Sequence, residues 1–450
     1  MKKMAVIGMG YVGIPAAALF ADSGEFTVIG IQRRSQRSGW KIDFLNKGQS
    51  PFPGNEPGMA ELIHRVVMEK KTFSVTDNFN VLSEMDVVLI DVQTPVDEDH
   101  IPRYESLREV SKTTGQLLKK SALVCVESTV APGTTQHVVK PILEEESGMV
   151  AGKDVHLAFS YERVMVGRLL YNIQNYPRVV GGLTSECSKV AVDLYNSIVK
   201  APVPGTDCMT AEVSKTVENA YRDVNIAFAN EVALMCESLG VNVYEVRELV
   251  NNLPNDPSNP AANPVRNMHM PGAGVGGHCL PKDSWLLKYG VDTYGRVPID
   301  IKVINGCRNV NDYMPIHMAK LALSELAAAN ILPEQAKITI LGYTFLENSD
   351  DTRNTPSQMI VKYFEREKIR NICIHDPYVR EEELPIVERD VYRSLEEADC
   401  ACLMTRHSEY NNLDTKRMAM VMRNPVVIDG RNVIKRDTGD NIKLISLGVG

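Results

Sequence analysis

The residue of this sequence best suited to covalent chemistry is a cysteine in a glycine-dense segment. Cys279 lies in the run GVGGHCLPKD at 274–283. Glycines at this density let a substrate approach the backbone closely, whereas an isolated cysteine is more often a small buried apolar residue. A thiol attacks as the thiolate, which is scarce at neutral pH, so a nucleophilic role needs positive charge nearby. Lys282 and Asp283 supply charge of both signs just after the cysteine.

Positive charge and a hydrogen-bond donor also stand together upstream, at Lys215 and Asn219. The two residues are four positions apart, so in a helix they share one face. An ammonium and an amide side by side can stabilise an oxygen that becomes anionic, and one such donor contributes about 3–4 kcal/mol. On spacing alone, a solvated lysine beside a surface asparagine is the commoner arrangement, and both interpretations stay open.

A second set of glycines, GMGYVG at 8–13, is typical of a dinucleotide site. It follows an apolar run at 3–7 that predicts a buried strand, and it opens a helical run through Leu19. The glycines permit a tight turn, a close approach to a diphosphate and close helix–strand packing, with the phosphates at the helix N-terminus. We therefore predict that a nicotinamide cofactor contacts Gly8, Gly10, Tyr11, Val12 and Gly13.

The residues after the second expected strand decide which nicotinamide cofactor fits. About 20 residues past the glycines, where Asp or Glu would take the ribose hydroxyls, stand Gln32, Arg33 and Arg34. Two arginines beside an uncharged residue could accept the 2′-phosphate of NADP. Alternatively, they are solvated and stack over the adenine of NAD. The choice between NAD and NADP therefore stays open.

Composition limits the classes of partner. The 450 residues include 57 Asp and Glu against 49 Lys and Arg, a formal net charge of −8, which argues against nucleic acid as a partner. The nine cysteines are an odd number without a CxxC pair, so we expect a reducing cytoplasm, no disulfide framework and no metal site. No run of about 18 apolar residues occurs, so we expect no membrane contact.

Apolar runs alternate with helical patterns in both halves of the chain, which predicts an α/β protein with two Rossmann-like parallel sheets. Strands are expected at 3–7, 26–31, 86–92, 122–126 and 156–159, in KITILG, NICIHDP and PVVIDG, and near 400–404. Between the halves, 206–239 contains no glycine or proline and has helix-period apolar residues, which predicts one long helix. Its apolar face needs a partner, so we expect a homodimer.

We accordingly expect three domains. They are a Rossmann domain that binds NAD or NADP at 1–204, a central helical domain with the dimer surface and the Cys279 loop at 205–330, and a second α/β domain at 331–450.

These segments together resemble the UDP-glucose/GDP-mannose dehydrogenase family over nearly the whole chain. The similar segments of the first half are GMGYVGIP (8–15), LNKGQSPFPGNEPGM (45–59), QTP (93–95), ESTVAPGTT (127–135) and YERVMVGR (161–168). Those of the second half are AEVSKTVENAYRDVNIAFANE (211–231), GVGGHCLPKD (274–283), DDTRNTPS (350–357), HDPY (375–378) and DGRN (429–432). The resemblance implies that 331–450 binds the UDP part of a nucleotide sugar.

The resemblance also implies a reaction. Members oxidise the C6 alcohol of the sugar to a carboxylate with two NAD, a four-electron oxidation that passes through a thiohemiacetal and a thioester on the cysteine. Lys215 and Asn219 would then steady the anionic oxygen, and Asp283 would position or activate water with Glu162 and Thr129. The resemblance thus predicts these five residues and Cys279 as catalytic.

Further binding residues follow from the same resemblance. Additional cofactor contacts are predicted from Gln32, Arg33, Thr94, Pro95 and Thr129. Contacts to the nucleotide sugar are predicted from Glu162, Arg163, Lys215, Asn219, Arg266, Gly276, Arg353 and Arg431. For the last two arginines, pairing with Asp351 and Asp429 is an equal alternative.

Details of the segments indicate a branch of the family. His278 before Cys279, and the Glu162-Arg163 pair, look closest to members acting on UDP-N-acetylhexosamines, notably UDP-N-acetylmannosamine. Val166 stands where UDP-glucose members have a second glutamate, which agrees with that branch. Leu346 stands where many members have a lysine that meets the nucleotide sugar.

The main hypothesis is a cytoplasmic nucleotide-sugar 6-dehydrogenase that makes a UDP-N-acetylhexosaminuronate for a surface polysaccharide. The alternatives are a 6-dehydrogenase for UDP-glucose, UDP-N-acetylglucosamine or UDP-N-acetylgalactosamine, and a two-electron 3-hydroxyacid-type dehydrogenase. The last of these would need neither Cys279 nor a second α/β domain.

Overall fold

The structure is a computed structural model that describes residues 1–36, 38–52, 56–252, 258, 267–380, 383–384, 386–435 and 441–450. The chain divides into two compact units. The first unit is Met1–Glu218 with Trp285–Ile299, and the second is Asn219–Ser284 with Asp300–Gly450. Helices α8 (Cys208–Leu239) and α10 (Leu280–Tyr294) each contribute residues to both units. The division into three domains stays a prediction.

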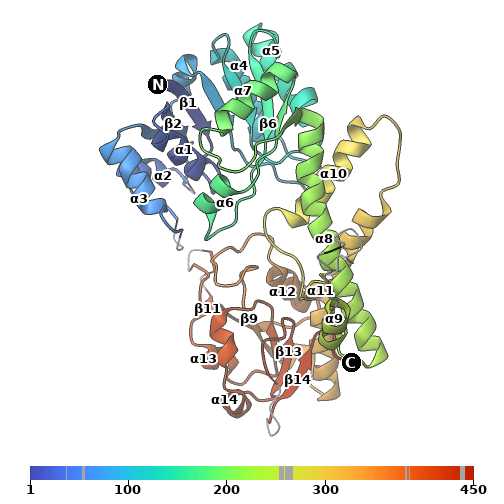
Figure 1. Ribbon diagram of the computed structural model, residues 1–450. Coiled ribbons are helices and arrows are strands. Elements are labelled where there is room, and N and C mark those ends of the chain that lie inside the picture. The colour runs from blue at the N-terminus through green and yellow to red at the C-terminus, as the bar shows by residue number, and fades with distance from the viewer. Residues whose placement is uncertain are drawn as a thin grey trace. The chain divides into compact units, whose positions relative to one another are not determined.

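The first unit is built on an eight-stranded sheet in the order β3-β2-β1-β4-β5-β6-β7-β8, most of it drawn in blue to green in Figure 1. Its neighbouring strands are parallel except β6 and β7. The strand order reverses between β1 and β4, the place where open parallel sheets bind ligands beyond their carboxyl ends. The strands are β1 (Lys2–Ile7), β2 (Phe26–Ile31), β3 (Phe73–Thr76), β4 (Val87–Ile90), β5 (Leu123–Val126), β6 (His156–Ser160), β7 (Val180–Gly182) and β8 (Gly205–Asp207).

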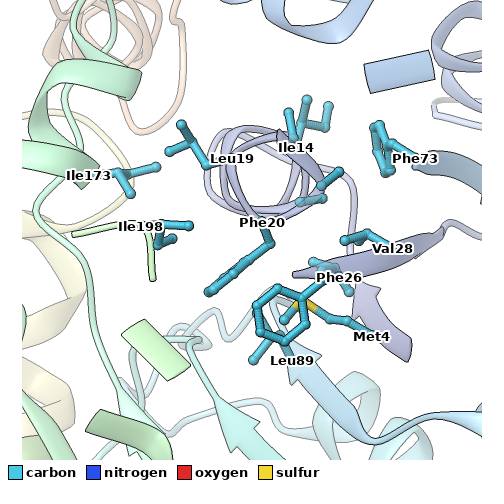
Figure 2. Close-up of a cluster of buried hydrophobic side chains, with 14 of the residues drawn as sticks. Met4, Ile14, Leu19, Phe20, Phe26, Val28, Phe73, Leu89, Ile173 and Ile198 are labelled. Carbon is cyan, nitrogen blue, oxygen red and sulfur yellow. The ribbon is translucent and has the colours of Figure 1, made fainter. Parts of the chain in front are cut away.

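Helices cover both faces of this sheet because successive residues of each buried strand point to opposite sides. Met4 and Val6 of β1 enter one core cluster with α1, α2, α3, α6 and α7, and Ala5 and Ile7 enter another with α4 and α5. Figure 2 shows the first cluster, in which the ring of Phe20 of α1 packs edge-on against that of Phe26, with centroids 5.5 Å apart. The helices are α1 (Gly13–Asp22), α2 (Trp40–Asn46), α3 (Met59–His64), α4 (Glu105–Leu117), α5 (Lys140–Ser147), α6 (Leu169–Asn175) and α7 (Ser185–Tyr195). Short 3-10 or π segments are η1 (Arg65–Glu69), η2 (Phe79–Glu84) and η3 (Thr135–Val139).

The second unit contains a six-stranded sheet, orange to red in Figure 1, in the order β11-β10-β9-β12-β13-β14 with all neighbours parallel. Helices α11 and α12 pack on one face, and α13 and α14 on the other. The strands are β9 (Lys337–Leu341), β10 (Asn371–His375), β11 (Val387–Glu388), β12 (Cys400–Leu403), β13 (Val426–Asp429) and β14 (Lys443–Ser446). The remaining helices are α9 (Val243–Asn251), α11 (Lys302–Ala328), α12 (Pro356–Arg366), α13 (Val391–Leu395) and α14 (Thr415–Val421), with 3-10 turns η5 (Pro333–Gln335) and η6 (Ser408–Asn412).

The predicted α/β class with two Rossmann-like parallel sheets is confirmed. The long helix begins two residues later than the predicted 206, because Gly205–Asp207 instead pairs with β7 as the edge strand β8. Among the described helices, none is long and apolar enough to cross a membrane.

Candidate active site

The loop after β1 has the shape that a dinucleotide needs. Gly8 has a φ of +110°, and a Cβ there would lie 2.1 Å from the Asp91 carbonyl oxygen, so only glycine fits the turn. A Cβ on Gly10 would meet nothing within 4 Å, which leaves open space beside the loop. Helix α1 then begins at Gly13 without a side-chain cap. Its first-turn N–H groups and the open loop therefore fit the diphosphate of NAD.

The side chain of Gln32 is bonded within this region. Its Oε1 accepts a hydrogen bond from the Met9 backbone N–H at 3.1 Å, and its Nε2 donates to Ser38 Oγ at 3.0 Å. Tyr11 of the glycine loop stacks on Phe52, with ring centroids 5.1 Å apart. Gln32 thus connects the end of β2 to the predicted cofactor loop.

Both arginines after Gln32 form ion pairs with carboxylates. Arg33 Nη2 lies 2.6 Å from Glu109 Oε2. Arg34 Nε lies 3.0 Å from Asp77 Oδ2, and its Nη2 lies 3.4 Å from Asp43 Oδ1. Three carboxylates therefore surround two guanidinium groups. This local balance disfavours a further phosphate dianion.

Two loops at the carboxyl ends of β4 and β5 hold other predicted cofactor residues together. Thr94 Oγ1 donates to the Thr129 carbonyl oxygen at 2.6 Å, and Ser128 Oγ donates to the Val92 carbonyl oxygen at 2.7 Å. The Pro95 carbonyl oxygen accepts from the Arg103 backbone N–H at 2.8 Å. The two loops are thus fixed to each other at the reversal point of the sheet.

Lys215 is buried, unlike the solvated lysine that its spacing alone would favour. Its Nζ donates to the Glu162 carbonyl oxygen at 2.9 Å and lies 5.2 Å from the centre of the Tyr161 ring. Arg163 forms an ion pair with Glu218, its Nε 2.9 Å from Oε2. The first unit thereby brings Lys215, Glu162 and Arg163 together at the end of β6.

Cys279 is exposed and stands directly before the first residue of α10. Its carbonyl oxygen accepts the backbone N–H groups of Lys282 and Asp283, at 3.0 and 2.9 Å. The N-terminus of a helix carries partial positive charge, which stabilises a thiolate. Burial and the charge of Lys282 lower the pKa of His278 to about 4, so this imidazole is uncharged at neutral pH and does not supply that charge.

The carboxylate of Asp283 is buried one turn after the cysteine. Asn219 Nδ2 donates to its Oδ2 at 2.5 Å, and Lys282 Nζ donates to its Oδ1 at 2.7 Å. Asn219 therefore points at Asp283, within the same unit. The two residues that were predicted to act on the anionic oxygen and on water are bonded to each other.

A buried polar network holds both ends of the cysteine loop (272–284). At its C-terminal end, Ser284 Oγ donates to Asp223 Oδ2 at 3.3 Å. At its N-terminal end, the Gly272 backbone N–H donates to Asn230 Oδ1 at 2.9 Å. Asn311 of α11 connects the two ends, since it donates to Asp223 Oδ1 at 2.8 Å and accepts from Asn230 Nδ2 at 2.9 Å.

Arg308 of α11 supplies the charge that balances this network. Its Nη1 lies 2.7 Å from Asp223 Oδ1, and both side chains are at most 1% exposed. The sequence reasoning missed Asp223, Asn230, Arg308 and Asn311. The positions of Asp223 and Asn230, four and eleven residues after Asn219 on α8, were the available signal, because these spacings share one helix face.

The middle of the cysteine loop lies on the loop after β9. The Gly277 backbone N–H donates to the Arg353 carbonyl oxygen at 2.9 Å, and Asn354 Nδ2 donates to the Gly277 carbonyl oxygen at 3.0 Å. A Cβ on Gly276 would lie 2.5 Å from Phe345 Cβ, so a side chain there would push the two loops apart.

Arg353 and Arg431, in the loops after β9 and β13, have different hydrogen-bond partners. Arg353 Nε donates to Asp351 Oδ1 at 2.8 Å, the pairing that was one of its two interpretations. The guanidinium of Arg431 instead donates to two carbonyl oxygens, of Met404 at 2.7 Å and of Gly274 at 3.3 Å. Arg266 lies outside the described residues. Within the described parts of the chain, no three His, Cys, Asp or Glu side chains form a group that could hold a metal ion.

Comparison with known proteins identifies similar domains along the chain. Models of the UDP-glucose/GDP-mannose dehydrogenase family match at residues 2–199 for the NAD binding domain, 209–313 for the central domain and 339–436 for the UDP binding domain. A UDP-N-acetyl-D-mannosamine dehydrogenase from Pyrococcus horikoshii is 36% identical over 433 residues, 96% of each chain.

Solved structures are similar over almost the full length. An NDP-N-acetyl-D-galactosaminuronic acid dehydrogenase from Methanosarcina mazei has a TM-score of 0.88 and 41% identity, with 100% of this chain and 95% of that chain covered. A UDP-D-ManNAc dehydrogenase from Pyrococcus horikoshii has a TM-score of 0.88 and 35% identity, with 99% of each chain covered.

The exposure of Cys279 predicts selective labelling. The other eight cysteines are buried or half-buried, so iodoacetamide should modify the native protein first at Cys279, with one equivalent incorporated. Peptide mapping by mass spectrometry after short exposure measures this. The Cys279→Ser variant should lose the fast phase, and Cys373→Ser, at the half-buried cysteine, should keep it. Fast labelling at any other cysteine would contradict the exposed position.

Proposed function

Because the chain belongs to the UDP-glucose/GDP-mannose dehydrogenase family, and is thus an NAD-dependent nucleotide-sugar dehydrogenase, we propose that it oxidises the C6 alcohol of UDP-N-acetylmannosamine to the carboxylate. The observation that carries the proposed chemistry is an exposed thiol at a helix N-terminus, one turn from a buried carboxylate. The sugar follows from the relatives from Pyrococcus horikoshii.

A second candidate substrate is the nucleotide-linked N-acetylgalactosamine. It is favoured by one observation, the 41% identity to the Methanosarcina mazei protein named for the galactosaminuronic acid. Both sugars carry the same C6 alcohol and an acetamido group. The proposed chemistry is therefore the same for both, and only the recognition of the sugar ring differs.

The overall reaction converts an alcohol, two NAD⁺ and water into a carboxylate, two NADH and three protons. When bound at the glycine loop 8–13, NAD would supply the hydride acceptor for each of the two oxidations. In the proposed path the Cys279 thiolate attacks the aldehyde carbon to give a thiohemiacetal, and loss of hydride from that carbon gives a thioester. Water then attacks the thioester, and the Cys279 thiol leaves. A thioester can be hydrolysed in this way because the thiol is a good leaving group, whereas an alkyl ether could not be.

The polar residues take the remaining roles in the proposal. Lys215 and Asn219, one turn apart on α8, stabilise the oxygen that becomes anionic. Asp283 positions or activates the attacking water, helped by Glu162 and Thr129. The bonds from Asn219 and Lys282 fix the orientation of Asp283 for that role.

The UDP part of the nucleotide sugar is proposed to bind in the second α/β domain. The family model for UDP binding covers 339–436, which supports binding by the predicted domain at 331–450. The proposed contacts are Glu162, Arg163, Lys215, Asn219, Arg266, Gly276, Arg353 and Arg431. The half-buried guanidinium of Arg431, which meets carbonyl oxygens, is well suited to an added diphosphate charge.

We propose NAD rather than NADP as the cofactor. The carboxylates around Arg33 and Arg34 already balance the charges that a 2′-phosphate would need. Gln32 is the residue next to the ribose in this proposal, because it joins the end of β2 to the glycine loop.

The product is proposed to serve the synthesis of a surface polysaccharide, in the cytoplasm. No disulfide joins the cysteines that the structure describes, which agrees with a reducing compartment.

Counting reduced cofactor tests the covalent path. With UDP-N-acetylmannosamine we expect two NADH per sugar and a uronate product, measured by absorbance and mass spectrometry. Cys279→Ala should bind the UDP-sugar with unchanged affinity but make no uronate, because the thioester cannot form. Cys373→Ala is the matched control and should keep both. One NADH per sugar, or uronate from Cys279→Ala, would refute the path, and a higher kcat/KM for UDP-N-acetylgalactosamine would favour the second substrate.

The ratio of kcat/KM for NAD and NADP tests the cofactor. We expect NAD to be preferred at least about tenfold, an energy difference of about 1.4 kcal/mol. Glu109→Gln frees Arg33 and should reduce that preference, since one cation becomes available to the 2′-phosphate. Glu105→Gln, on the same helix but paired with Arg103, should leave the ratio unchanged. An NADP preference in the unmodified protein would overturn the assignment.

We propose a homodimer through the second-unit part of α8. Tyr221, Phe228, Met235 and Leu239 share one face of this helix and are each at least 52% exposed. An apolar stripe of this length on a helix is the usual sign of a partner surface.

Light scattering after size exclusion tests the dimer. The unmodified protein should run at twice the chain mass. Phe228→Glu should give monomers, because a carboxylate inside an apolar interface loses its hydration. Met420→Glu, at a more exposed apolar residue of α14, should stay dimeric. A monomeric unmodified protein would refute the proposal.

A further inference from the structure

Two carboxylic acids follow the neighbouring strands β4 and β5, next to the place where the strand order of the first sheet reverses. Strands β4 and β5 pair in parallel with Ile90 opposite Val126, so Asp91 and Glu127 follow at neighbouring strand ends. They begin the two loops that carry Thr94, Pro95 and Thr129. Neither carboxyl group has a role in the functions that are predicted for these loops.

One carboxyl oxygen of Glu127 accepts two hydrogen bonds. Its Oε1 accepts from the Tyr195 hydroxyl at 2.6 Å and pairs with Arg178 Nη2. Arg178 is held in turn by Ser160 Oγ, which accepts from its Nε at 2.9 Å, and its guanidinium lies 4.0 Å from the centre of the Tyr195 ring. The side chains of Arg178 and Glu127 are 3% and 0% exposed.

One oxygen of each of the two carboxyl groups indicates that the pair carries a proton. Glu127 Oε2 and Asp91 Oδ2 are both buried, and neither accepts a hydrogen bond from any described donor. The pairing of Ile90 with Val126 places the two side chains at neighbouring strand ends, so each is a candidate partner for the other. Ionised carboxylates are acceptors only, so these two oxygens can bond to each other only if one of the groups carries a proton. One proton also leaves a single negative charge against the single positive charge of Arg178.

The surroundings favour the protonated form. Burial raises the pKa of Asp91 well above its usual value, the charges of Glu127 and Glu162 raise it further, and Arg178 opposes them. Cys125 and Tyr195 also face the pair, and burial raises the pKa of both, so they add no negative charge at neutral pH.

We propose that Asp91 and Glu127 share one proton and act as positioning residues that join the bases of loops 91–95 and 127–129. The bonds from Ser128 to Val92 and from Thr94 to Thr129 lie just beyond this join. Loss of the proton would place two anions against one cation and push the loops apart. The orientation of the predicted cofactor residues thus depends on a proton that takes no part in the reaction.

The stability of Asp91→Asn against pH tests the proton. In the folded protein Asp91 keeps a proton that it loses in the unfolded chain above pH ~4. The protonated Asp91 side chain therefore makes folding less favourable as the pH rises from the unfolded-state pKa of Asp91 towards its higher folded-state pKa. Asn is neutral at every pH and can donate its N–H to Glu127. The Tm of Asp91→Asn minus that of the unmodified protein should therefore become steadily more positive as the pH rises above about 5.

Asp22 provides the matched control in the same unit. Its ion pairs with Arg65 and Lys70 lower its pKa to about 2, so it is ionised in both folded and unfolded chains above about pH 5. Asp22→Asn should lose stability by an amount that stays constant over the same pH interval. A constant difference for Asp91→Asn as well would overturn the shared proton.

Cofactor affinity tests the positioning role without relying on turnover. Asp91→Asn should bind NAD within about twofold of the unmodified protein at neutral pH, since its amide replaces the O–H donor. Asp91→Ala should raise the Kd for NAD several-fold while circular dichroism stays native. The unmodified protein should lose NAD affinity at alkaline pH, and Asp91→Asn should not. Equal pH profiles for the two would refute the positioning role, whichever sugar the enzyme uses.

Discussion

The ion pair between Asp223 of α8 and Arg308 of α11 is buried, and the cysteine loop is hydrogen-bonded to the side chains around it. Removing one member of a buried pair leaves an uncompensated charge that costs about 3–5 kcal/mol, far more than a surface pair contributes. The position of Cys279 is therefore coupled to the packing of two long helices. A loop rich in glycine has little rigidity of its own, so this outside support explains how it can hold a reactive group in place.

The two sheets place their predicted ligands by the same rule. Each has a strand order that reverses beside its first strand in sequence, β1 in one and β9 in the other. Parallel sheets present the carboxyl ends of their strands to ligands at such a reversal. The loops that follow β1, β4 and β5 carry the proposed cofactor residues, and the loop that follows β9 supports the cysteine segment. One architecture thus occurs twice, with different loop chemistry.

The sequence predicted the features that depend on local pattern. Continuous apolar runs identified nine strands, and the absence of glycine and proline identified α8, because these signals lie within a single segment. Short edge strands such as β3 and β8 were not predicted. In β3 the exposed Ser74 interrupts two buried apolar residues, and β8 has only three residues. Pairing with a neighbour, which no local pattern records, makes them strands.

The same distinction between local pattern and long-range contact applies to the candidate site. Spacing and family resemblance selected Cys279, Asp283, Lys215 and Asn219, and their roles stay proposals. The residues that hold them could not be selected, because Asp223 meets Arg308 across 85 positions of sequence. The same holds for Glu127 and Arg178, which are 51 positions apart. A buried polar pair is recognised only when the fold brings its members together.

The contrast between one exposed thiol and eight sheltered ones has a consequence for oxidative stress. Peroxide oxidises accessible thiolates first, to a sulfenic acid that other thiols can reduce again. Damage to this protein would therefore begin at the atom proposed to carry the substrate, while the core cysteines stay intact. Inactivation would precede any loss of structure, and a cellular thiol could reverse it before the sulfur is oxidised further to the sulfinic acid, which thiols do not reduce.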